Sequence, residues 1–250
     1  MNDWLWERYS LLASRIIRGG NFTRRIEWPV VIKWLNPQQG EQILDVACGR
    51  GGLTLRTCAA GSHTVGLDLS EAGMKWAALS AIHLRHNCSF VAADAHQLPF
   101  RDACFDKVVS SSALEHFQHD GKALMEMNRV LKPNGVLVLT VDSFTYPFDD
   151  TWTARHRDAF YVVNYYDKNK LREKLVKAGF QITQSKYIMH SRTARFFFKR
   201  AIAHYRSFLL SGAIVLIAYP LIAIAERFSR NDVSGFSLIA KAKKTVFDNI

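Results

Sequence analysis

Residues 41–55, EQILDVACGRGGLTL, constrain the fold of this chain more than any other stretch. Ile43, Leu44 and Val46 form a short apolar run, which is typical of a parallel strand covered on both faces. The glycines that follow allow the backbone to turn sharply against a ligand, and the apolar residues after them indicate a helix. The stretch therefore predicts a strand, a tight turn and a helix, with a ligand lying across the turn.

Asp45 indicates which kind of ligand this is. Its carboxylate stands at the end of the predicted strand, where it would repel a phosphate group and attract a cation. Nicotinamide and flavin enzymes instead have G-x-G-x-x-G at this place, without an acid in the turn. Asp45 therefore favours a cofactor with a positive charge over a dinucleotide.

The sequence LDVACGRG at residues 44–51 resembles the first motif of the class I S-adenosylmethionine-dependent methyltransferases, approximately V-L-D-x-G-C-G-x-G. Ala47 stands where that family often has its first glycine, and we expect this exchange to alter the approach of the cofactor slightly. The resemblance implies an α/β fold with a doubly wound, mostly parallel seven-stranded sheet whose last strand is antiparallel. It also implies that Asp45, Ala47, Gly49 and Gly51 bind S-adenosylmethionine.

A second acid, Asp68, ends the apolar run that begins at His63 and follows Gly49 by 19 residues. At this distance one strand-helix-strand unit brings the end of the second strand beside the first turn, where a carboxylate can accept both ribose hydroxyls. We assign Asp68 and its neighbour Leu69 to the cofactor. A nicotinamide cofactor would also need Asp68, so only its combination with Asp45 favours S-adenosylmethionine.

A third apolar run, from Cys88, leads to Asp94 and Ala95. In the family that the chain resembles, the matching pair holds the adenine, and the carboxylate accepts its exocyclic amine. Aspartates at strand ends more often cap turns. Three of them at these spacings nevertheless indicate one cofactor site.

The predicted fourth strand, about residues 106–110, leads into SSALEHF at residues 111–117, beyond the carboxyl end where ligands of such sheets bind. The Asn/Asp-Pro-Pro-aromatic sequence of enzymes that methylate base amines is missing here, so nucleic acid is not expected. The loop resembles the small-molecule branch of the family, with its quinone and sterol methyltransferases, and residues 128–135 are close to the family's R-x-L-K-P-x-G. We assign Ser111 to the cofactor.

Methyl transfer is an in-line displacement that needs alignment and a place for the acceptor's proton, and no metal. His116 is the first candidate for a general base or an acceptor-orienting residue, because it follows the fourth strand. Glu115 and His156 are weaker candidates. A histidine in this place is as often a local hydrogen-bonding residue.

The pattern predicts three parts. Residues 1–40 are helices, at about 3–18 and 24–35, that either pack on the sheet or close over the cofactor. Residues 41–189 and 233–250 form the methyltransferase domain. They include an aromatic connection at 143–166, a helix at 167–178 and strands near 181–188 and 235–243. In the fold that the chain resembles, the segment matching 143–166 covers the acceptor site. Residues 190–232 are an insertion between the last two strands.

The insertion is basic and then apolar. Residues 1–150 contain 15 Lys and Arg against 16 Asp and Glu, whereas residues 151–250 contain 18 against 6, which suggests an anionic partner. The uncharged run 207–225 has the length of a membrane span, but both ends of the insertion must return to one sheet. We therefore expect a monotopic element on an anionic membrane surface. A lid, a buried helix or a homodimer contact is the alternative.

The four cysteines at 48, 58, 88 and 104 form no C-x-x-C pair and no zinc spacing, so free thiols in a reducing compartment are expected. No signal peptide is apparent at the start, and the expected location is the cytosolic face of a membrane.

The leading hypothesis is methylation of an oxygen or carbon of a lipophilic small molecule, such as a quinone, an isoprenoid or a lipid-linked metabolite. The alternatives are a soluble natural-product or metabolite methyltransferase, an RNA methyltransferase, and a cofactor-binding membrane partner without turnover.

Overall fold

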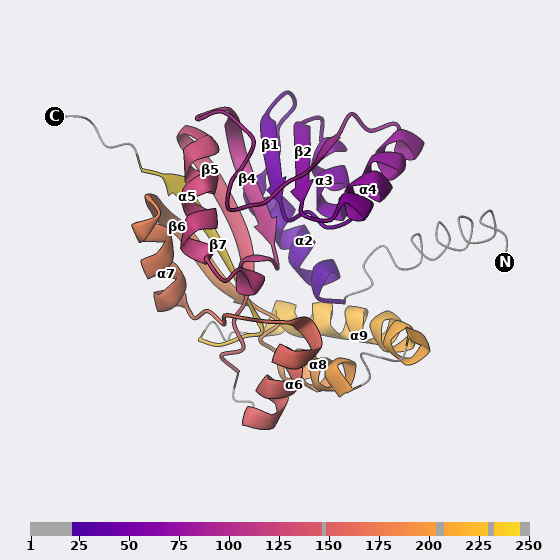
Figure 1. Ribbon diagram of the computed structural model, residues 1–250. Helices are drawn as coiled ribbons and strands as arrows, with labels where there is room; N and C mark the ends of the chain where they lie inside the picture. Colours follow the sequence, from indigo (N-terminus) through magenta and orange to yellow (C-terminus); the bar gives the residue numbers. More distant parts are fainter. Residues whose placement is uncertain (1–21, 147–148, 204–207, 230–232, 246–250) are drawn as a thin grey trace.

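The computed structural model describes residues 22–146, 149–203, 208–229 and 233–245 (Figure 1). Its centre is a seven-stranded sheet in the order β3-β2-β1-β4-β5-β7-β6, in which β7 is antiparallel to both neighbours and the pairs among the first five strands are parallel. The predicted fold class is therefore confirmed. The strands are β1 Gln42–Val46, β2 His63–Asp68, β3 Ser89–Ala92, β4 Phe105–Ser111, β5 Leu131–Asp142, β6 Phe180–Ile188 and β7 Ser237–Lys244.

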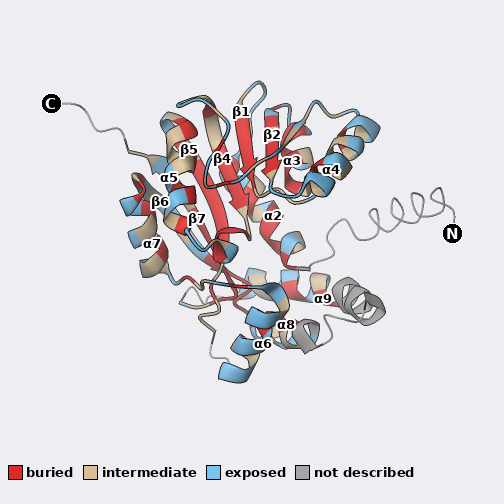
Figure 2. Ribbon diagram, viewed as in Figure 1, coloured by how far each residue is buried: buried red, intermediate tan, exposed pale blue. Residues whose placement is uncertain are grey.

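Helices cover both faces of the sheet, and neighbouring strand residues point to opposite faces. Val108 and Leu238 pack in one core with α5 and α7, whereas Val109 and Ile239 pack in the other with α2, α3, α8 and α9. Figure 2 shows the strands buried between helices whose outer faces are exposed. The helices are α2 Phe22–Leu35, α3 Gly52–Cys58, α4 Glu71–Leu84, the 3-10 turn η1 Leu114–His116, α5 Asp120–Val130, α6 Asp150–Phe160, α7 Lys168–Lys177, α8 Arg192–Ala203 and α9 Phe208–Phe228.

The connection after β5 contains a helix, α6, that the aromatic pattern of residues 143–166 did not predict. Asp149 caps it, because its side chain accepts a hydrogen bond from the backbone N–H of Trp152 at 3.1 Å. The predicted helix at 24–35 is confirmed as α2. The predicted helix at 3–18 lies outside the described residues.

The insertion leaves the sheet and returns to it at the end where the parallel strands have their carboxyl termini. β5 ends at Asp142, which lies opposite Ser237 of β7, and Ser237 lies opposite Ile188 of β6. The chain therefore leaves for α8 and α9, and comes back, beyond the carboxyl ends of the parallel strands. Figure 1 shows α6, α8 and α9 gathered at this end, with α9 beside α2. Within the part of the chain that the structure describes, no helix has both the length and the apolar character needed to cross a membrane.

Two of the four cysteines are not free, so that prediction is wrong for this pair. Cys58 ends α3 and Cys88 directly precedes β3, and a disulfide joins them across a Cα–Cα distance of 6.2 Å. Their separation of 30 residues gives no sign that the two segments meet, because only the folded sheet brings them together. Cys48 and Cys104 are free thiols.

Candidate active site

The turn after β1 runs through three left-handed residues. Ala47 and Gly49 have φ of 58° and Gly51 has φ of 73°. A Cβ on Gly51 would lie 2.7 Å from Phe90 Cε1, so this glycine is needed for packing, whereas a Cβ on Gly49 would meet nothing within 4 Å. The open side of the turn is therefore at Gly49. Ala47 adopts the same conformation with a side chain, which costs roughly 1–2 kcal/mol.

Asp68 fixes the position of this turn. Its Oδ2 accepts a hydrogen bond from the Gly49 N–H at 2.8 Å, and its Oδ1 accepts one from the Ser70 N–H at 3.0 Å. Each carboxylate oxygen keeps capacity for a further donor. Leu69, beside it, is 76% exposed. The end of β2 thus presents an acceptor group and an apolar surface together.

Asp45 lies buried under the same turn, where its Oδ2 accepts a hydrogen bond from Thr54 Oγ1 at 2.7 Å. Burial raises the pKa of Asp45 to about 7, and the hydrogen bond from Thr54 opposes the shift. The negative charge of Asp68 raises the pKa further. A cationic group beside this pair would favour the ionised form again. The site is therefore suited to a positively charged ligand.

Asp94 follows the end of β3 by two residues and is exposed, and Ala95 beside it is buried. Hydrogen bonds from the backbone N–H and side chain of His96 lower the pKa of Asp94. The next stretch of loop is held by Arg129 of α5, which donates to the carbonyls of Leu98 and Phe100 at 3.0 and 2.8 Å. The arginine of the R-x-L-K-P-x-G pattern therefore positions the loop that carries Asp94.

Three carboxyl groups lie close together at the ends of β4 and β5; the side chains of Glu27 and Glu115 are buried, whereas that of Asp142 is 20% exposed. Glu27 comes from α2, Glu115 from η1, and Asp142 is the last residue of β5. Glu27 accepts hydrogen bonds from the hydroxyls of Ser112, at 2.9 Å, and of Ser237. Neither carboxyl oxygen of Glu115 has a hydrogen-bond partner of good geometry among the described residues, although the backbone N–H groups of Glu115 and Asp142 lie near enough to oppose the rise of its pKa. Ser111 lies next to this cluster, with its hydroxyl 3.2 Å from that of Thr140.

Burial raises the pKa values of all three carboxyl groups of this cluster, Glu27, Glu115 and Asp142. It raises the pKa of Asp142 to about 8, and the charge of Glu27 adds to the effect. Burial also raises the pKa of Glu115 well above its ordinary value, with Asp142 and Glu27 as further causes. The pKa of Glu27 is raised by burial as well, against the hydrogen bonds of its serine partners. Near neutral pH, Asp142 is therefore mostly protonated, and burial shifts the pKa of Glu115 in the same direction.

His156 connects this cluster to the protein surface. Its Nε2 lies 3.7 Å from Asp142 Oδ2, and its Nδ1 lies 2.9 Å from the hydroxyl of Tyr165, which is partly exposed. Burial lowers the pKa of His156 to about 3, so its imidazole is neutral. His116 is exposed, with Nδ1 3.3 Å from the carbonyl oxygen of Tyr161. Of the three proposed proton-handling residues, Glu115 and His156 are thus buried around Asp142, and His116 lies at the surface.

Sequence reasoning missed Glu27 and Asp142. Asp142 ends a parallel strand, as Asp68 does, and Asp45 stands one residue before the end of β1, so the same rule could have found it. No sequence pattern marks Glu27, whose partners are 85 and 210 residues away. Among the described residues, no three His, Cys, Asp or Glu side chains are grouped so that they could hold a metal ion.

Comparison with known proteins agrees with this geometry. A family model described as a methyltransferase domain matches residues 44–139. The demethylmenaquinone methyltransferase of Staphylococcus saprophyticus is 30% identical over 174 residues, which cover 60% of this chain and 74% of that protein. The chain belongs to the class I S-adenosylmethionine-dependent methyltransferases.

Two further proteins are similar to this methyltransferase. The phthiotriol/phenolphthiotriol dimycocerosates methyltransferase 1 of Mycobacterium ulcerans is 40% identical over 107 residues, 40% of this chain but only 37% of that protein's length. The crystal structure of geranyl diphosphate C-methyltransferase from Streptomyces coelicolor, in complex with Mg²⁺, geranyl-S-thiolodiphosphate and S-adenosyl-L-homocysteine, has a TM-score of 0.67. It is 16% identical and covers 88% of this chain and 75% of that one, a likeness of fold alone.

The cofactor of this methyltransferase is S-adenosylmethionine, as its sequence predicts. The fold brings the predicted cofactor residues of β1 and β2 into direct contact around one turn, through the bond from Gly49 to Asp68. Asp94 and Ala95 follow the adjacent strand. Which of these side chains touch the cofactor stays a prediction.

Proposed function

We propose that this methyltransferase transfers the methyl group of S-adenosylmethionine to an oxygen or carbon of a lipophilic small molecule at a membrane surface. The observation that carries the proposal is the turn after β1: its open side is at Gly49, whose N–H binds the carboxylate of Asp68, and Asp45 lies near enough for the charge of Asp68 to raise its pKa. S-adenosylmethionine supplies an electrophilic methyl group on a cationic sulfonium. The carboxyl groups of Asp45 and Asp68 suit this ligand, which carries both a positive charge and a ribose.

Each of the other cofactor residues has a role in this proposal. Asp68 accepts the ribose hydroxyls with the capacity left beside Gly49 and Ser70, and exposed Leu69 packs on the adenine. Asp94 accepts the adenine amine, and Ala95 leaves room for the ring. Ser111 contacts the cofactor from the end of β4. Ala47 and Gly51 adopt the left-handed conformations that form the turn.

The acceptor is a lipophilic molecule that enters from the end of the sheet covered by α6, α8 and α9. The Staphylococcus relative is named for demethylmenaquinone and the Mycobacterium relative for phthiotriol, which supports this class of acceptor. Aromatic side chains are concentrated here, where the rings of Phe144, Phe198 and Phe236 lie 4.0–5.8 Å apart by their centroids. An apolar acceptor that reaches these rings would remove its own apolar surface from water, which is favourable.

Exposed apolar side chains on α9 support action at a membrane. Leu221, Ile224 and Phe228 are 47%, 59% and 78% exposed at helical spacing, with exposed Arg227 beside them. On α8, Phe196 is 53% exposed next to Arg200, whose guanidinium lies 4.7 Å from its ring centroid. Apolar groups flanked by arginines suit an anionic lipid surface, and we propose the cytosolic face of a membrane as its location.

The test is transfer of labelled methyl from S-adenosylmethionine into lipid. The purified protein is incubated with anionic vesicles that contain reduced demethylmenaquinone, with vesicles that contain phthiotriol, and with vesicles of the same phospholipid alone. We expect label in an extractable product that depends on an added acceptor and rises with vesicle surface. Cofactor binding without labelled lipid would contradict the proposal and favour a partner without turnover. Labelling of soluble metabolites alone would favour a soluble methyltransferase.

A further inference from the structure

Glu115 is a buried carboxyl group without a hydrogen-bond partner of good geometry for either oxygen among the described residues. A buried polar group left in this state costs roughly 1–3 kcal/mol, so such groups are rarely kept without a use. Its backbone is held firmly, because the Glu115 carbonyl accepts hydrogen bonds from the N–H groups of Val163 and Asn164, both at 2.9 Å. The side chain is therefore held beyond the end of β4, on the side of the sheet where ligands of such folds bind.

The surroundings of the cluster indicate the chemistry of a donor that could bind it. His156, next to Asp142, is packed among aromatic rings, with centroids of Phe144 and Phe160 at 4.4 and 4.8 Å from its own. Phe198 of the insertion lies on it as well, at 5.6 Å. An aromatic surface beside an unpartnered carboxyl group suits a planar molecule that carries a hydroxyl group.

We propose that Glu115 and Asp142 bind a hydroxyl group of a hydroquinone-type acceptor, whose ring packs against the aromatic side chains around His156, and that Asp142 takes the hydroxyl proton during transfer. This inference rests on the proposed function and narrows the acceptor to molecules with an acidic aromatic hydroxyl. It also adds Asp142 to the residues that touch the acceptor.

The step balances without a further reactant. The acceptor's O–H bond breaks and its proton goes to a carboxylate oxygen of Asp142. The oxygen's electron pair forms the bond to the transferred methyl carbon. The bond from that carbon to the donor sulfur breaks, and sulfur keeps the pair. The products are a methyl ether, a neutral thioether and one proton.

We assign the way out for the proton to His156, whose Nε2 lies 3.7 Å from Asp142 Oδ2, so that a small movement of either side chain completes a hydrogen bond. His156 faces Asp142 with one ring nitrogen and the hydroxyl of partly exposed Tyr165 with the other, and a neutral imidazole can accept at one nitrogen while it donates at the other. The titratable groups that face Asp142 are Glu27 from α2, Glu115 from η1, His156 from α6 and Tyr165 before α7, and His116 faces His156.

The first test needs no methyl transfer. Protonated carboxyl groups give a separate infrared carbonyl band, and in the wild-type protein this band should shift when naphthohydroquinone is added under nitrogen. Naphthalene, the same ring without hydroxyl groups, should leave it unchanged. The shifted band should be absent from Glu115→Gln and Asp142→Asn and present in Asp158→Asn, a control on the exposed face of α6. An unshifted wild-type band would overturn the inference.

The second test uses the pH dependence of methyl transfer to naphthohydroquinone, measured as its methyl ether. The wild-type rate should rise with pH and level off above the pKa of Asp142, about 8, because only its ionised form accepts the proton. Asp142→Asn should be slower by about a hundredfold or more and lose this dependence, while its affinity for S-adenosylhomocysteine stays within about threefold. An unchanged rate and profile in Asp142→Asn would overturn the inference and leave the proposed function intact. A shifted infrared band without any transfer would contradict the proposed function and support the hydroxyl site.

Discussion

The backbone of Ala47 is strained, because at φ of 58° its Cβ lies close to its own carbonyl oxygen. Ala47→Gly should therefore stabilise the protein by up to about 1 kcal/mol, after the greater freedom of glycine in the unfolded chain is subtracted. A rise of the thermal midpoint would show it. The matched control is Ala78→Gly in the middle of α4, which should lower the midpoint by a similar amount. A lower midpoint in Ala47→Gly would contradict the assigned backbone.

The pH dependence of stability should reveal Asp45. Its pKa is raised from 3.8 to about 7, so folding favours the protonated form. The stability that this gives is complete below pH 4 and is lost as the pH rises to about 7, to the extent of about 4 kcal/mol. Asp45→Asn keeps an acceptor for Thr54 and should remove that loss. Denaturant unfolding at pH 4 and pH 8 measures it. Equal pH dependence in both proteins would show that Asp45 is not buried as described.

Single residues were predictable from the sequence where a short pattern fixes their place. Asp45, Gly49 and Asp68 follow apolar runs, and parallel strands bring such ends to one edge. Glu27 was not predictable, because its hydrogen bonds to Ser112 and Ser237 depend on three separate elements meeting. Glu115 was selected for its position after the fourth strand, but its lack of a partner appears only in the folded protein.

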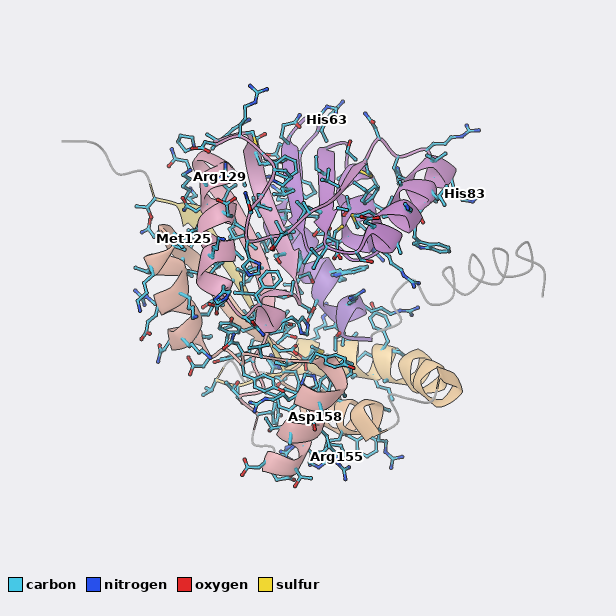
Figure 3. All side chains as sticks on the ribbon, viewed as in Figure 1. His63, His83, Met125, Arg129, Arg155 and Asp158 are labelled. Carbon is cyan, nitrogen blue, oxygen red and sulfur yellow. A yellow bond between two sulfur atoms is a disulfide. The ribbon has the colours of Figure 1, made fainter. Side chains whose placement is uncertain are left out.

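At the scale of elements, α5 and the loop after β3 are joined through Arg129 (Figure 3), which lies at the opposite end of the molecule from Arg155 and Asp158 of α6. Arg129 also bonds Glu126, at 2.7 Å, and Asp102, at 2.8 Å. Lysine carries the same charge but cannot form this fork of bonds.

Arg129→Lys should therefore lower stability by about 1–2 kcal/mol and weaken binding of S-adenosylhomocysteine severalfold, because the loop also carries Asp94. Thermal unfolding and calorimetric titration measure the two effects. Arg101→Lys, at an exposed position of the same loop, should change neither. If Arg129→Lys matches this control in affinity, the loop does not contribute to the cofactor site.

Elements were predictable to different degrees for physical reasons. The buried parallel strands have continuous apolar runs that need no knowledge of their neighbours. The helix α6 was missed because its aromatic residues form no clear apolar stripe, so the cap at Asp149 was not recognised as the start of a helix. The disulfide of Cys58 and Cys88 was missed because the contact between α3 and the start of β3 is tertiary.

For the whole molecule, we propose that the insertion brings the enzyme to a membrane surface. The protein should float with anionic vesicles, and replacing Leu221, Ile224 and Phe228 by Ser should abolish flotation, because these exposed side chains lose their transfer free energy into the acyl region. The control replaces Leu79 and Ile82, equally exposed apolar residues of α4, by Ser and should still float. If the triple variant floats as well as the wild type, α9 is a lid and the acceptor is not taken from the membrane through it.

The most direct test of the account is calorimetric titration of S-adenosylhomocysteine into the wild-type protein, Asp68→Ala and Asp158→Ala. Asp68 supports the turn at Gly49 and is the proposed ribose acceptor, whereas Asp158 is exposed on α6. We expect the wild type and Asp158→Ala to bind equally and Asp68→Ala to bind at least about tenfold more weakly, with its circular dichroism spectrum unchanged. Equal affinity in all three would show that the cofactor does not lie across the ends of β1 and β2.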